Sequence, residues 1–155
     1  MGTALGFRVE GTVVHWALVN EIEDGELVLE DSASFSSPRG ESEARALTYV
    51  RERVGRVIEQ HGPSCGAVKY TEPTARSSGD GPRRRARIEG VILQRMDEAG
   101  MLTLGAAYNV ISPRLGTNSA KQFMDDENYR GMHWADVTPL LKEAILAAAA
   151  AMKGA

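Results

Sequence analysis

Residues 5–20 read LGFRVEGTVVHWALVN. This segment is rich in the β-branched and aromatic side chains that favour strands, and the predicted fold is built outward from it. Gly11 interrupts it, so a tight turn near Glu10 and Gly11 predicts two strands paired as a hairpin. Apolar and polar residues then alternate over residues 27–35, which predicts a third strand. The chain is therefore expected to open with a three-strand meander.

The rest of the chain alternates between helical and strand patterns. Apolar residues three and four positions apart predict a helix over residues 41–60, which the sequence His61-Gly62-Pro63 terminates. Thr138 followed by Pro139 has the form of an N-cap before a first-turn proline, and it predicts the start of the final helix. Between these helices we expect a strand over residues 65–70, a helix from Pro82 or Arg83 to about Ala99, and a strand over residues 101–111.

This element order predicts an α/β domain with a mixed β-sheet and helices on both of its faces. The chain has 155 residues and no internal repeat or linker, so we expect a single domain over residues 1–155. Apolar residues make up 43% and charged residues 25%, which is typical of a globular protein and excludes wholesale disorder.

Composition also excludes several classes of protein. The single cysteine, Cys65, forbids an intramolecular disulfide, and no spacing of Cys and His residues is typical of a structural zinc site. No apolar run approaches the ~20 residues of a membrane span, and the first residues lack the pattern of a secretion signal. We therefore expect no membrane partner and a cytoplasmic location.

The net charge of −3 conceals an uneven distribution of charge. Residues 64–90 hold six basic and three acidic residues, a net charge of +3, so the rest of the chain carries −6. Three consecutive arginines fall in the first turn of the predicted second helix, where the macrodipole disfavours cations unless an anion lies nearby. Arginine forks beside helix-start amides suit phosphate groups. The candidate nucleic-acid-binding residues are Lys69, Arg76, Arg83, Arg84, Arg85 and Arg87.

Four short strings resemble those of the ribonuclease H-like fold, in particular its RuvC-type resolvase branch. LGFRVEG over residues 5–11 is similar to an opening strand of the form hydrophobic-Gly-hydrophobic-Asp-x-Gly, and GAVKY over 66–70 to the fourth strand, which ends in a catalytic Glu. RIEGVI over 87–92 is similar to the helix that follows, and Ala135-Asp136 to the Ala-Asp that supplies the last carboxylate. The resemblance implies a carboxylate site that holds two divalent cations for phosphodiester cleavage.

The chain departs from that pattern at the catalytic positions. Arg8 stands at the first-strand Asp position and Lys69 or Tyr70 at the fourth-strand Glu position, so only Asp136 matches the resemblance. A cation at a ligand position removes one metal bond and also repels the metal. We therefore predict no metal site and no cofactor.

Three functions remain open. The first is a catalytically degenerate domain that binds DNA, RNA or a nucleoprotein partner through the arginine cluster. The second is an active nuclease, dependent on Mg²⁺ or Mn²⁺, in which Glu10 and Glu72 join Asp136 as relocated catalytic carboxylates. The third is a protein-interaction or homo-oligomer subunit whose arginines meet acidic residues across an interface. The substitutions at the catalytic positions favour the first.

Overall fold

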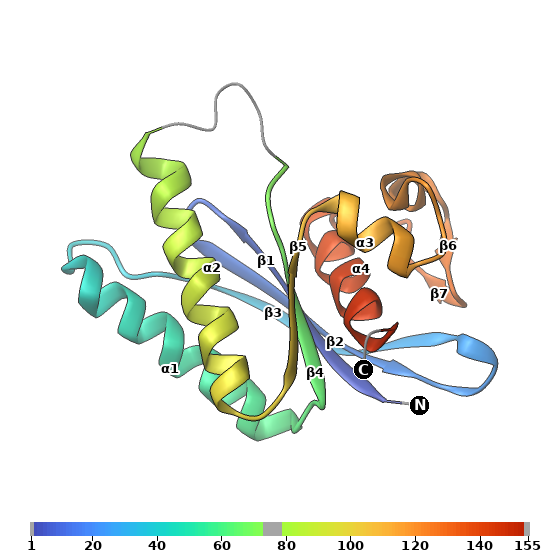
Figure 1. Ribbon diagram of the computed structural model, residues 1–155, viewed down its shortest axis with the longest axis horizontal. Helices are drawn as coiled ribbons and strands as arrows, with labels where there is room; N and C mark the ends of the chain where they lie inside the picture. Colours follow the sequence, from blue (N-terminus) through green and yellow to red (C-terminus); the bar gives the residue numbers. More distant parts are fainter. Residues whose placement is uncertain (1, 73–78, 154–155) are drawn as a thin grey trace.

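A mixed β-sheet forms the centre of the molecule in a computed structural model that describes residues 2–72 and 79–153. Within these residues the sheet has five strands in the order β3-β2-β1-β4-β5 (Figure 1). The first three strands form the antiparallel meander, while β4 and β5 run parallel to β1. The strands are β1 (Thr3–Glu10), β2 (Val13–Glu21), β3 (Leu27–Ser36), β4 (Cys65–Lys69) and β5 (Leu102–Ala106).

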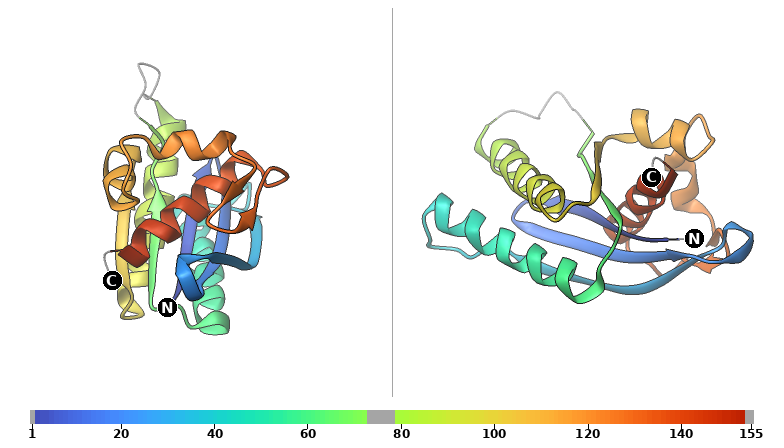
Figure 2. Two further views of the ribbon diagram at one scale, coloured as in Figure 1. Left: turned by 90° about the vertical axis from the view of Figure 1, so that its right-hand side faces the viewer. Right: turned by 60° about the horizontal axis from the view of Figure 1, so that its bottom comes forward.

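Helices cover both faces of this sheet. Figure 2 shows α1 and α2 on one side of the strands and α4 on the other. These helices are α1 (Glu43–His61), α2 (Asp80–Glu98) and α4 (Pro139–Lys153). Ser42 caps the start of α1, and Gly62 ends that helix in the left-handed conformation. The predicted α/β class, with helices on both faces, is therefore confirmed.

The start of α2 differs from the sequence prediction. The helix begins at Asp80 instead of Pro82 or Arg83, so Arg83 is its fourth residue, and Arg84 and Arg85 lie beyond the first turn. The first turn contains Asp80 itself, whose negative charge the macrodipole stabilises there. In the part of the chain that the structure describes, no helix combines the length and the hydropathy needed to span a bilayer.

The segment after β5 also differs from the prediction of a strand over residues 101–111. The strand ends at Ala106, and a helix begins at Tyr108. The reason is a tertiary contact, because the Glu72 carboxylate accepts a hydrogen bond of 2.7 Å from the Tyr108 backbone nitrogen at the start of that helix. The remaining elements are η1 (Glu23–Gly25), α3 (Tyr108–Arg114), η2 (Ala120–Asp125), β6 (Asn128–Tyr129) and β7 (Met132–His133).

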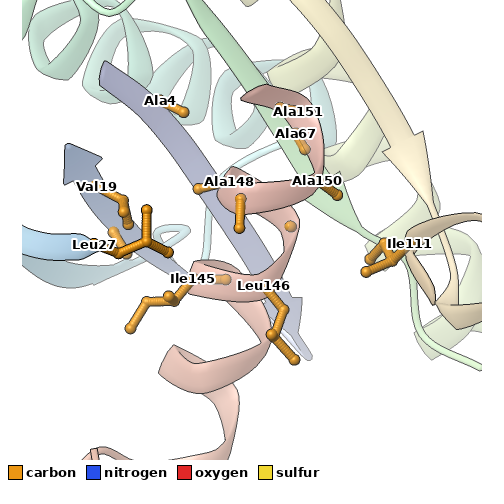
Figure 3. Close-up of a cluster of buried hydrophobic side chains, with 14 of the residues drawn as sticks. Ala4, Val19, Leu27, Ala67, Ile111, Ile145, Leu146, Ala148, Ala150 and Ala151 are labelled. Atoms are coloured by element: carbon orange, nitrogen blue, oxygen red, sulfur yellow. The ribbon is translucent and has the colours of Figure 1, made fainter. Parts of the chain in front are cut away.

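Side chains along β1 alternate between two cores. Leu5, Phe7 and Val9 are fully buried against α1 and α2. Ala4 belongs to the second core, between the sheet and α4. In Figure 3, Ile145 and the alanines of α4 lie against the sheet in this second core.

Gly6 sets the position of α4 on the sheet. A Cβ atom at Gly6 would lie 1.7 Å from the Ala144 carbonyl oxygen, so no larger residue fits between β1 and α4. This close approach fixes where α4 lies along β1. Glu143, the residue before Ala144, consequently lies beside Arg8, which is two positions after Gly6 on the same face of the sheet.

Candidate functional site

The carboxyl ends of β1 and β4 bring Arg8 and Lys69 together. The two residues are direct partners in the parallel β1–β4 pairing. They occupy the strand positions at which the family resemblance implies the first two catalytic carboxylates. Three further residues complete the arrangement around them. We call the group formed by Arg8, Lys69, Glu72, Tyr108 and Glu143 the ion cluster.

Lys69 is buried at the centre of the ion cluster, with 1% of its side chain exposed. Its ammonium group donates to the Glu72 carboxylate at 3.1 Å and to the Tyr70 carbonyl oxygen at 2.6 Å. The same nitrogen lies 3.5 Å from the Glu143 carboxylate and 4.1 Å from the centroid of the Tyr108 ring. Because an ammonium group has three donors, these neighbours satisfy it without an external ligand.

Arg8 contacts Glu143 as well. Its Nε donates to Glu143 Oε1 at 2.9 Å, and its Nη1 donates to the Thr71 hydroxyl at 2.9 Å and to the Val9 carbonyl oxygen. Only 12% of the Arg8 side chain is exposed. The Glu143 carboxylate is thus held between a guanidinium and an ammonium group.

Glu143 is a stable carboxylate in this position. Burial acts to raise its pKa, but the hydrogen bond from Arg8, the charge of Lys69 and a hydrogen bond from Tyr108 outweigh burial. The pKa of Glu143 consequently lies below its ordinary value of 4.5. Burial first, and then the charge of Glu143, raise the pKa of the Tyr108 phenol, which keeps this hydroxyl a neutral donor.

The ion cluster balances its own charge. Two cations, Arg8 and Lys69, face two carboxylates, Glu72 and Glu143. Over residues 2–72 and 79–153, no three His, Cys, Asp or Glu side chains converge in a way that could hold a metal ion. The residues present therefore do not fit the two-metal centre that the resemblance implies, because a divalent cation would meet fixed positive charges in place of ligands.

The three predicted carboxylates do not come together. Glu72 belongs to the ion cluster, where it bonds Lys69 and the start of α3. Glu10 is exposed at the end of β1, at the hairpin with β2. Asp136 lies before α4, with its side chain 95% exposed and 3.7 Å from His133. The acid that the final helix supplies to the ion cluster is thus Glu143 and not Asp136.

Sequence reasoning missed Glu143 and Tyr108. Glu143 is the only acidic residue of the final helix, and it lies four positions before the buried Ala147. A lone acid on the apolar face of a helix was therefore the available signal. Tyr108 gave no comparable signal, because the residues around it predict a strand.

Three exposed arginines lie near the start of α2, and we call Arg83, Arg84 and Arg87 the arginine surface. Arg87 pairs with Glu43 of α1 at 3.1 Å, with about half of each side chain exposed. Such an exposed pair contributes little to stability and leaves the guanidinium group accessible. The arginine surface is the part of the predicted nucleic-acid-binding set that the structure places in solvent.

The other members of that set lie elsewhere. Lys69 belongs to the buried ion cluster, and Arg76 lies outside the described residues. Arg85 is half-buried, and its charge acts on Glu89, which is 6% exposed. Burial raises the pKa of Glu89 although nearby cations, Arg85 foremost, act to lower it. Within residues 2–72 and 79–153, Glu89 Oε2 has no hydrogen-bond partner.

Several solved structures are similar to this chain in fold, whereas comparisons of its sequence find no match. No protein-family model and no curated protein matches the chain. Thermus thermophilus RuvC is similar with a TM-score of 0.76 at 17% identity, over 96% of this chain and 92% of that chain. T. thermophilus RuvC in complex with Holliday junction substrate gives 0.74 at 14% identity, over 97% and 92%. The yeast mitochondrial Holliday junction resolvase Ydc2 gives 0.62 at 10% identity, over 97% and 77%.

The matches cover nearly all of this chain, although sequence identity stays at 17% or below. They agree with the mixed sheet and with the helices on its two faces. Structural similarity at this low sequence identity establishes the fold of the chain and nothing more. The chain therefore has the ribonuclease H-like fold of the RuvC type.

Proposed function

We propose that this chain is a catalytically degenerate RuvC-type domain that binds DNA or RNA through the arginine surface. The ion cluster is the observation that carries the proposal. Two-metal cleavage of a phosphodiester needs clustered carboxylates, whereas Arg8 and Lys69 stand at the ends of β1 and β4 and are neutralised by Glu143 and Glu72. A metal ion could enter only by displacing a buried ammonium group from its partners.

The exposed guanidinium groups support phosphate as the ligand. Arginine presents a planar fork of donors that matches phosphate oxygens, and the arginine surface lies near the N-terminal end of α2. Among the described residues, only Arg87 of these three has an acidic partner, Glu43. The similarity to T. thermophilus RuvC in complex with Holliday junction substrate agrees with a nucleic-acid ligand. Binding of this kind tolerates different sequences and weakens as salt increases.

A salt titration tests the binding. Fluorescence anisotropy with a labelled duplex would compare the wild-type protein with the triple variant Arg83→Ala, Arg84→Ala, Arg87→Ala. If each arginine neutralises one phosphate, the slope of log K against log salt falls in magnitude by about 3 in the variant. The matched control is Arg45→Ala, Arg56→Ala, Lys153→Ala, which removes the same charge from exposed positions elsewhere. Equal slopes in all three proteins would remove the arginine surface as the binding site.

A cleavage assay tests the degeneracy. Wild-type protein with Mg²⁺ or Mn²⁺ is expected to leave branched DNA and RNA–DNA hybrids intact. If the wild-type protein cleaves these substrates and Glu143→Gln or Asp136→Asn abolishes the cleavage, the result would instead support an active nuclease. Size measurement over a salt series separates nucleic-acid binding from a role as a protein-interaction subunit, because an oligomer held by arginine–carboxylate pairs dissociates as salt increases.

A further inference from the structure

A cleft of about 480 Å³ lies on the side of the sheet opposite the ion cluster. Its walls come from the β1–β2 turn, the loop after β3 and the N-terminal halves of α1 and α2. The volume is in the range of sites that hold small organic ligands. Arg84 lines this cleft and also belongs to the arginine surface, so the two features are continuous.

The lining of this cleft is apolar at its base and charged around it. Ala46 and Leu47 of α1 lie beside Ile88 of α2, which is 1% exposed and part of the core. The charged groups of the lining are two guanidinium groups and two carboxylates, from Arg39, Arg84, Glu41 and Glu43. An apolar floor with a few polar groups at its rim is the usual design of a site for a flat, partly polar ligand.

The charges favour a nucleobase over a bare phosphate as the occupant. Two carboxylates, Glu41 and Glu43, line the cleft together with two guanidinium groups, Arg39 and Arg84, so the lining carries no net charge and gives a bare anion no net attraction. A base is uncharged, offers N–H donors to carboxylates, and can stack against an arginine plane or pack on an apolar surface. Its own phosphates would remain outside, against the arginine surface.

We propose that this cleft accepts one unpaired nucleobase of a strand whose phosphates bind the arginine surface. The inference rests on the proposed function and specifies its ligand, because only a single-stranded or splayed segment can present a base in this way. The domain consequently binds single strands, ends and branch points in preference to continuous duplex. Glu41 and Glu43 accept hydrogen bonds from the base, while Arg84 lies between the base and the backbone.

The ligand itself provides the first test. Wild-type protein is expected to bind a single-stranded oligonucleotide roughly tenfold more tightly than an abasic strand with the same number of phosphates, the effect of about one stacked base. Equal affinity for the two strands would overturn the inference. The proposed function would still stand if the triple arginine variant weakened binding of both strands.

A cleft-filling variant provides the second test. Ala46→Phe places a ring over the floor of the cleft, whereas Ala44→Phe places the same ring at an exposed α1 position outside it. Ala46→Phe is expected to weaken single-strand binding roughly tenfold and to change duplex binding less than about twofold. Ala44→Phe should change neither affinity. Equal single-strand affinity for both variants and wild type would contradict the inference, and failure of wild type to bind any strand would overturn the proposed function as well.

Discussion

Lys69 of the ion cluster and the arginine surface come from one basic stretch of the sequence, residues 64–90, but they behave differently in the structure. Lys69 is 1% exposed and shared between two carboxylates, whereas Arg83 and Arg84 are exposed. The buried cation is neutralised within the protein and is unavailable to a phosphate. The exposed cations keep their charge for a ligand. Whether a basic side chain can bind an anion therefore depends more on its burial and its ion pairs within the protein than on its position in the sequence.

Lys69→Met is expected to have the largest effect on stability. The substitution keeps an apolar stem of similar length but leaves the Glu72 and Glu143 carboxylates without their ammonium partner. Breaking a buried pair in this way costs about 3–5 kcal/mol of unfolding free energy. Urea unfolding measures the loss. Lys121→Met, at an exposed lysine that lines a pocket together with the residues of the ion cluster, is the control and should change stability by less than about 0.5 kcal/mol.

The double variant Arg8→Asp, Lys69→Glu is expected to make stability depend on a metal ion. It replaces both cations beside Glu143 with carboxylates, which repel one another until a divalent cation neutralises them. At an Mn²⁺ concentration of 100 times Kd, binding would restore about 2.7 kcal/mol. Thermal melting with and without Mn²⁺ measures this shift, which wild type should lack. A shift that survives the further change Glu143→Gln would place the metal elsewhere.

Stability should also fall in acid because of Glu143. The folded state holds the pKa of this carboxyl below its ordinary value of 4.5. The stabilisation that ionised Glu143 gives to the folded state is therefore present above pH 4.5 and is lost as pH falls through the folded pKa. Glu143→Gln lacks the titrating group. The difference in unfolding free energy between wild type and variant should therefore shrink as pH decreases. A difference that is constant with pH would contradict the charged pairing.

The contribution of Glu89 to stability should depend on pH in the opposite direction. Its substitution should change the free energy of unfolding least among these variants. The pKa of Glu89 is raised above the ordinary value of 4.5. The stability that protonated Glu89 contributes to the folded state is therefore present below pH 4.5 and is lost as pH rises through the folded pKa. Glu89→Gln should consequently stabilise the protein near neutral pH and lose that advantage in acid. Chemical unfolding at several pH values measures the change. Greater stability of the variant at low pH alone would contradict the assignment.

The ion cluster shows where prediction from the sequence stops. Alternation in the first strand and its glycine interruption predict the meander, and the resemblance places Arg8 and Lys69 at the catalytic positions. Asp136 and Glu143 are seven positions apart, and both could supply an acid from the end of the chain. Only the packing of Ala144 on Gly6 decides between them, because it sets the register of α4 on the sheet. Likewise, the bond from Tyr108 to Glu72 favours a helix where local propensity predicts a strand.

The α/β class, the meander and most of the helices could be predicted from the sequence, because periodicity and capping are local properties of the chain. Together with the family resemblance, the sequence predicted cations at two strand positions where that resemblance implies carboxylates. Tertiary structure alone decided that Lys69 is buried while Arg83 and Arg84 are exposed, and that Glu143 completes the ion cluster. The physical reason is that burial and ion pairing arise between segments far apart in the chain, such as β1 and α4, whose register no local pattern specifies.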